Sequence, residues 1–270
     1  MRHRQSSWAI LLFLVTTLYP IGSWAQTLGL APAQVVHKFK PGVPFEFELA
    51  TANNGESAVD MNVEITDLWY NDKGDKIFPA PGSAPRSAAN WIQFVPEHFA
   101  IAAHATQKMK AVVTPPQDAR GGYYAVLFVT SRPQLTFDRT REGKQIYTNM
   151  RLGCLVLLTA ENTENYKIEL SNLRLKPPAA NQGLDVTFDV ANASNTHVFP
   201  VGRVAVLDSS RKLVAKAQSD MIRLLPGQRN SLQVDWGGSL PQGSYTAVLT
   251  VTYGEDRVET QQIPFNVSAP

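Results

Sequence analysis

One arrangement of strands and turns occurs twice in this sequence of 270 residues. In the first copy, residues 96–129, apolar and polar residues alternate, a Pro-rich corner follows, and a continuous apolar run ends the unit. In the second copy, residues 219–252, the same order returns, and Tyr245-Thr-Ala-Val-Leu249 takes the place of Tyr124-Ala-Val-Leu-Phe128. Alternation with a period of two residues is typical of β-strands that have one buried face. A strand unit that occurs twice predicts an all-β fold with two tandem sandwich domains.

A polar break, ENTEN at residues 161–165, separates the two copies. After it, seven short apolar segments are separated by turn residues, which is the strand count of an immunoglobulin-like sandwich. We therefore predict an N-terminal immunoglobulin-like domain over residues 26–162 and a C-terminal one over residues 163–270. Because the linker is short, the two domains are expected to touch and to define a cleft.

Residues 1–25 have the features of a cleaved signal peptide. Arg2 and Arg4 precede an apolar run, and Ser23 and Ala25 place small residues at the cleavage positions. The expected mature chain begins at Gln26 and is exported. An uncleaved N-terminal anchor is the alternative.

Charge argues against two classes of partner. The expected leader contains two of the 25 Lys and Arg residues and none of the 23 Asp and Glu residues, so the remainder is formally neutral. Binding to nucleic acid or to an anionic membrane requires clustered basic residues. The later apolar runs have strand length, so we expect no integral membrane segment in the mature chain.

No motif points to a reaction. The single cysteine, Cys154, lies in an apolar stretch and is predicted to be a buried hydrophobic residue. The five histidines lack metal-ligand spacing, and no nucleotide-binding or nucleophile motif occurs. We expect a protein that is not an enzyme, with no catalytic residue, no metal site and no cofactor.

A resemblance adds to this interpretation. The run PGSAPRSAANWIQFVPEHFAIAAHATQKMKAVVTPPQDARGGYYAVLFV is similar to the first domain of PapD-type periplasmic pilus chaperones and to extracellular domains of WxL-interacting surface proteins. In the second half, RLLPGQRNSLQVDW and LPQGSYTAVLTVTYG carry the match. Both groups pair two immunoglobulin-like domains.

The chaperone resemblance implies a partner site. Such chaperones lend an edge strand to a fibre subunit and hold the subunit's terminal carboxylate with two basic side chains. The lent strand falls on residues 146–158, which lie either at an exposed edge or inside a sheet. A histidine near the expected first anchor departs from the usual arginine and is a weaker clamp. The expected partner-binding residues are Ile146, Met150, Arg151, Leu152, His37 and Lys38.

The resulting expectation is a periplasmic chaperone or accessory protein that assembles a pilus, fimbria or adhesin by β-strand complementation. Its partner would be a fibre or adhesin subunit, and an outer-membrane usher stays open as a second partner. The alternative is a non-catalytic module at the cell surface that binds cell-wall polymer or another surface protein. The polar segment 131–145 is either a mobile hairpin loop or a flap that contacts the partner.

Overall fold

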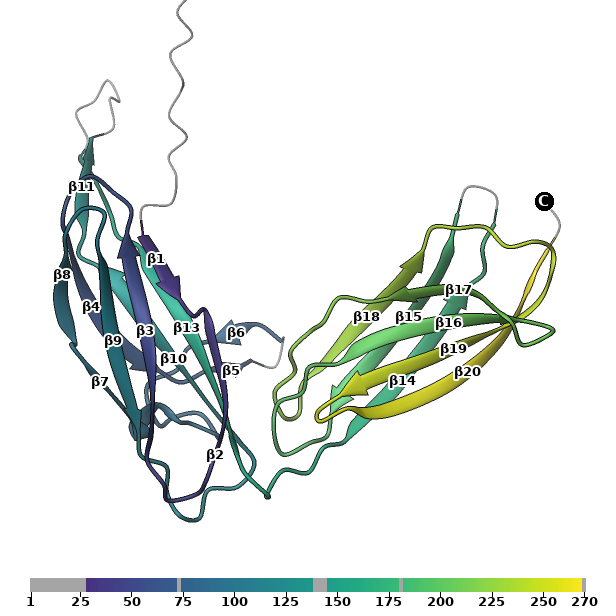
Figure 1. The fold of residues 1–270 in the computed structure, drawn as a ribbon, viewed down its shortest axis with the longest axis horizontal. Coiled ribbons are helices and arrows are strands. Elements are labelled where there is room, and N and C mark those ends of the chain that lie inside the picture. Colours follow the sequence, from purple (N-terminus) through teal and green to yellow (C-terminus); the bar gives the residue numbers. More distant parts are fainter. Residues whose placement is uncertain (1–27, 72–73, 138–144, 180–181, 269–270) are drawn as a thin grey trace, which may run out of the picture.

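The computed structural model describes residues 28–71, 74–137, 145–179 and 182–268, and it consists of two β-sandwiches (Figure 1). Each sandwich has its own cluster of buried hydrophobic residues. The predicted all-β fold with two immunoglobulin-like domains is confirmed. The expected leader, residues 1–25, lies outside the described residues, so export stays a prediction.

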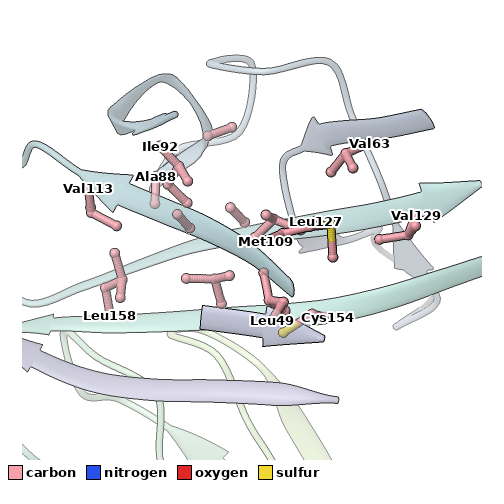
Figure 2. Packing of buried hydrophobic residues seen from close by; sticks show 14 of the residues in the cluster. Leu49, Val63, Ala88, Ile92, Met109, Val113, Leu127, Val129, Cys154 and Leu158 are labelled. Carbon is pink, nitrogen blue, oxygen red and sulfur yellow. The ribbon is translucent and has the colours of Figure 1, made fainter. Parts of the chain in front are cut away.

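The first sandwich packs a four-stranded sheet against a five-stranded sheet. In spatial order, the four-stranded sheet contains β1 (Leu28–Ala31), β3 (Phe45–Asn53), β9 (Thr106–Val113) and β7 (Ile92–Val95). The five-stranded sheet contains β2 (Gln34–Phe39), β13 (Arg151–Ala160), β10 (Gly122–Ser131), β4 (Val59–Thr66) and β8 (His98–Ile101). Alternating side chains of both sheets fill the core, where Leu49 and Met109 lie opposite Leu127 and Cys154 (Figure 2).

Cys154 is fully buried in this core, as predicted, and burial raises the pKa of its thiol to about 12. A thiol with so high a pKa stays protonated at neutral pH and is a poor nucleophile. Its contribution is therefore to packing.

The second sandwich has the seven strands that were expected. In spatial order, one sheet contains β14 (Ile168–Lys176), β15 (Leu184–Asn192) and β18 (Arg229–Trp236). The other contains β17 (Leu213–Gln218), β16 (Val201–Asp208), β19 (Gly243–Tyr253) and β20 (Arg257–Val267). The last strand of the first sandwich ends at Ala160 and the first strand of the second begins at Ile168, so the segment 161–167 connects them.

Two short hairpins and one helical turn complete the fold. The strands β5 (Trp69–Tyr70) and β6 (Lys76–Ile77) pair with each other, as do β11 (Gln134–Phe137) and β12 (Gln145–Thr148), and a 3-10 helix spans Ala89–Trp91. The predicted strand over residues 146–158 is therefore wrong as one unit. Its first part, β12, pairs with β11, and β13 begins only at Arg151.

The chain changes sheets close to its described start. β1 pairs with β3 in one sheet, and β2 pairs in parallel with β13 in the other. Pro32, which follows a cis peptide bond, lies between the two strands. β2 therefore forms an edge of the five-stranded sheet, and β1 an edge of the four-stranded sheet.

The two sandwiches repeat in a register that differs by one residue from the one the sequence suggested. The Tyr123 hydroxyl accepts a hydrogen bond from the Arg120 backbone N–H at 3.2 Å, and the Tyr245 hydroxyl donates one to the Pro241 carbonyl at 2.9 Å. Each tyrosine closes the corner before its strand. Tyr245 thus corresponds to Tyr123 and not to Tyr124. In a strand, a shift of one residue exchanges the two faces.

Candidate functional site

One stretch of β13 lacks a neighbouring strand on one side. β10 pairs with β13 along its whole length, from Arg151 to Thr159. On the opposite side, β2 pairs with β13 only from Leu155 onward, because β2 begins at Gln34. No described strand pairs with residues 151–154 on that side, although β1 of the other sheet lies close to β13. We call these four residues the open end of β13.

The backbone direction at the open end follows from the neighbouring bonds. The Leu155 N–H donates to the Ala33 carbonyl at 3.0 Å, so the backbone groups of Leu155 point away from β10. Direction alternates along a strand, so the N–H and C=O groups of Arg151 and Gly153 also point away from β10. The open end therefore presents two residues that can form main-chain hydrogen bonds with another strand.

The side chains at the open end are held on both faces of the sheet. Leu152 packs against the core of the first sandwich. On the other face, the Arg151 guanidinium lies 3.6 Å from the centre of the Phe128 ring and 3.3 Å from a Glu64 carboxylate oxygen. A Cβ atom at Gly153 would lie 2.9 Å from the Phe128 ring, so glycine makes room for this aromatic residue. The open end is an ordered strand segment with its edge exposed.

The structure separates the other predicted site residues from this end. The backbone of Ile146 belongs to β12, opposite Thr136, and its side chain lies outside the described residues. Met150 precedes β13 and packs against the core. Its carbonyl accepts a hydrogen bond from the Ser131 backbone N–H at 2.8 Å, and its own N–H donates to the Ser131 hydroxyl at 2.9 Å. A Met150 substitution would therefore perturb packing as well as the edge.

His37 and Lys38 lie near the far end of β13. Lys38 is opposite Thr159, eight residues from Arg151, which is roughly 26 Å along a strand. Arg151 and Lys38 are thus too far apart to bind one carboxylate. His37 stacks on Phe45 with ring centres 4.3 Å apart.

Lys38 already has two acidic partners in its own chain. Its ammonium group lies 2.8 Å from Glu164 in the connecting segment and also contacts Glu255 in the turn between β19 and β20. Hydrogen bonds to these two carboxylates raise the pKa of Lys38, with Glu164 the larger cause. Lys38 therefore ties the two sandwiches together in this structure.

The expected contact between the domains is formed by an apolar cluster that we call the interdomain seam. Its buried members are Leu68, Tyr124, Val126, Phe128, Leu157 and Leu225. Four of them lie on β10 and β13, on the face turned away from the first core. Leu225 belongs to the second sandwich, and Phe199 of that sandwich packs against the cluster. A pocket of about 510 Å³ adjoins the seam, between Trp69 and Tyr70 on one side and residues 225–229 on the other.

Polar contacts extend the seam on both sides of this cluster. The Gly122 N–H donates to the Asn195 carbonyl at 2.9 Å, and the Thr159 and Thr196 hydroxyls lie 2.8 Å apart. At the start of β2, the Arg223 guanidinium donates to the Gln34 side chain at 2.7 Å. The contact with Gln34 lies at the first residue of β2, which is opposite Leu155 at the limit of the open end.

His197 lies in this seam with 6% of its surface exposed. Its ring packs edge-on against Tyr124 and Phe199. Burial, with a smaller contribution from the charge of Arg223, lowers the pKa of His197 to about 4. The histidine is therefore neutral at neutral pH, and its protonation would place a charge in an apolar contact.

Sequence reasoning missed the seam residues. The pattern that could have indicated the seam is the continuous apolar runs of β10 and β13, because a strand that is buried on both faces has no alternating polar residues. No sequence pattern indicates the contact between Gln34 and Arg223, because only the fold brings these two residues together.

Within the described part of the chain, no cluster of three or more His, Cys, Asp or Glu side chains is arranged to hold a metal ion. In the same residues, no helix has the length and apolar character needed to cross a membrane.

No protein-family model matches the sequence, and no curated protein matches it. Among solved structures, the chain is similar to a class 5 fimbriae chaperone, CfaA, with 10% identity, a TM-score of 0.48 and coverage of 90% of this chain and 100% of that one. A chaperone-tip adhesin complex of CFA/I fimbriae gives 12% identity, a TM-score of 0.49 and coverage of 89% and 98%. The Salmonella enterica SafB chaperone complex with SafA pilin gives 11% identity, a TM-score of 0.43 and coverage of 89% and 96%. The expected resemblance to pilus chaperones is found again in these structures.

Proposed function

We propose that this protein is a non-enzymatic periplasmic chaperone that assists assembly of a pilus, fimbria or adhesin. It captures a fibre subunit by pairing a strand of that subunit with the open end of β13. The observation that supports this proposal is the exposed edge at residues 151–154, where Arg151 and Gly153 direct main-chain groups away from β10. An exposed edge of this kind is a template for strand addition.

The corresponding edge in the second sandwich supports the same interpretation. β20 occupies the position of β13 and has no second neighbour. Its sequence carries the usual protection of an edge: five of the six residues from Arg257 to Gln262 are charged or polar, Val258 being the exception, and Pro264 follows. The open end of β13, Arg-Leu-Gly-Cys, has one charge and no proline. Unprotected edges are retained where pairing with another chain is useful.

The seam prepares β13 for this function. Leu157 is buried between the sandwiches, and Val156 is buried in the first core. With both faces packed, the strand holds its extended form before a partner arrives. A preformed strand loses little conformational entropy on pairing, which favours binding.

A proline at the edge tests the proposal. Arg151→Pro removes an N–H that points to the open side, so the pairing with β10 is retained and the added strand loses a hydrogen bond. Arg151→Ala is the matched control, because it removes the same contacts with Glu64 and Phe128. We expect the alanine variant to capture a co-expressed fibre subunit and the proline variant to capture at least about tenfold less.

Thermal unfolding separates capture from folding. The two Arg151 variants should unfold within a few degrees of each other, since neither removes a bond to β10. Equal capture by both variants contradicts strand pairing at this edge. Binding of purified cell-wall polymer, without capture of any subunit, would favour the surface module instead.

A further inference from the structure

The outer face of β16, β17 and β19 in the second sandwich contains a hollow of about 630 Å³. Ala205 lies in its floor, directly between Lys216 on β17 and Val248 on β19. A methyl group between two longer side chains leaves a depression. Leu213, which is 53% exposed, extends the apolar lining.

This face corresponds to the one that forms the seam in the first sandwich. With Tyr123 aligned to Tyr245, the outward residues of β19 are Thr246, Val248 and Thr250, and their counterparts on β10 are Tyr124, Val126 and Phe128. The β10 residues are covered by protein, including Leu225 from the other domain. Val248 and Ala205 are half-exposed, and no described segment covers them.

Two cations border the hollow. Arg203 is adjacent to Thr250 and lies two residues before Ala205, about 7 Å along the strand from the row of Lys216, Ala205 and Val248. The Arg203 guanidinium donates to the Thr252 hydroxyl at 2.9 Å. Among the described residues, neither Arg203 nor Lys216 forms an ion pair, and no carboxylate lines the hollow.

We propose that this hollow is a docking site for a second protein partner, which inserts one aliphatic or aromatic side chain over Ala205 between two acidic residues. The apolar floor of the hollow complements the inserted side chain, and the cations Arg203 and Lys216 complement the two acidic residues. A protein partner is favoured over a lipid chain because the hollow is an open sheet face, and because its counterpart in the first sandwich receives Leu225 from a protein segment. The site is independent of the proposed function, since it lies on the other sandwich from the open end of β13.

The first test uses a defined probe and the full chain. A blocked peptide with the sequence Gly-Glu-Leu-Glu-Gly is titrated into isotope-labelled protein at low salt, and amide shifts are followed by NMR. We expect saturable shifts confined to residues 203–205, 213–218 and 248–250. Peptides with Lys-Leu-Lys or Glu-Gly-Glu at the centre should bind at least about tenfold more weakly. No shifts with the first peptide, or equal binding of all three, overturns the proposal.

Variants then locate the site. Arg203→Glu combined with Lys216→Glu should weaken peptide binding by at least about tenfold. Arg174→Glu with Lys176→Glu makes the same change in net charge on β14, in the opposite sheet, and should leave binding unchanged. Ala205→Trp fills the hollow and should abolish binding, and the dispersion of the NMR spectrum reports whether this variant is folded.

Phosphatidylglycerol vesicles test the competing occupant. Sedimentation with vesicles that is lost in the Arg203 and Lys216 double variant, without peptide binding by the wild type, would assign the face to a membrane surface and reject a protein partner. Equal peptide binding by the double variant and its β14 control also rejects the site.

Discussion

The corresponding strands β10 and β19 show how similar sequences produce different surfaces. Both are central strands, and both place Ala, Leu and Val at the positions that face their own core: Ala125, Leu127 and Val129 on β10, and Ala247, Leu249 and Val251 on β19. They differ on the other face, where β10 has Tyr124, Val126 and Phe128 and β19 has Thr246, Val248 and Thr250. In β10 this second face is buried in the seam, whereas in β19 it is half-exposed.

The second face of each central strand therefore determines which surface its domain leaves exposed. In the first sandwich, β10 is buried on both faces and holds β13 in place, so that the edge of β13 is what remains exposed. A strand buried on one face leaves a surface for a partner.

The largest effect is expected from a charge on each outer face. Val126→Asp places an unpaired carboxylate in the seam, where Val126 is 1% exposed, and should cost about 4 kcal/mol or more. Val248→Asp makes the same change on the half-exposed face and should cost about 1 kcal/mol or less. Urea unfolding of both variants measures the difference. Similar losses would show that the two faces are equally buried in solution.

Acid should weaken the seam through His197. In the unfolded chain its pKa has the usual value of about 6.5, whereas in the folded protein it is about 4. The unfolded state therefore binds the proton more tightly, so the contribution to stability is complete above pH 6.5 and is lost as the pH falls toward 4. The total loss is on the order of 3 kcal/mol.

Unfolding free energies between pH 7.5 and 4 measure this effect. His197→Gln should remove much of the pH dependence, because glutamine does not titrate. A slope that is unchanged in this variant would place the acid sensitivity elsewhere in the molecule.

Two glycines at the starts of β10 and β19 should give smaller effects. A Cβ atom at Gly122 would lie 2.3 Å from the Tyr124 hydroxyl and 3.0 Å from the Thr196 Cα, whereas at Gly243 the nearest atom would be 3.6 Å away. Gly122→Ala should therefore cost about 1–3 kcal/mol through overpacking of the seam. Gly243→Ala should change stability by about 0.5 kcal/mol or less. Thermal unfolding of the two variants compares them, and an equal shift in Tm would contradict close packing at Gly122.

The smallest effect is expected at the exposed end of the seam. The side chains of Lys38 and Glu255 are 42% and 47% exposed, so water and salt screen their attraction. Glu255→Gln should cost less than about 1 kcal/mol, and the cost should shrink in high salt. Glu259→Gln on β20 is the control without this contact. A larger loss that is insensitive to salt would mean that the ion pair orders the turn.

Local alternation of apolar and polar residues was enough to predict the all-β class, the two domains and most strand positions. Strands such as β15, where Leu184, Val186 and Phe188 alternate with polar residues, can be recognised from the sequence because one face packs on a core and the other faces water. The same local pattern indicated that Cys154 is buried. Nothing beyond neighbouring residues was needed for these predictions.

Which strand edge is exposed and which sheet face is covered could be read only from the folded chain. The open end of β13 exists because β2 begins at Gln34, after the change of sheet near Pro32. At that point Arg223, 189 residues away in the sequence, donates a hydrogen bond to the Gln34 side chain. The alignment of Tyr123 with Tyr245 likewise rests on contacts in the folded chain, namely the hydrogen bonds of the two tyrosine hydroxyls. Alternation tells how a strand distributes its side chains over two faces, but which face meets a partner depends on contacts between residues that are distant in the sequence.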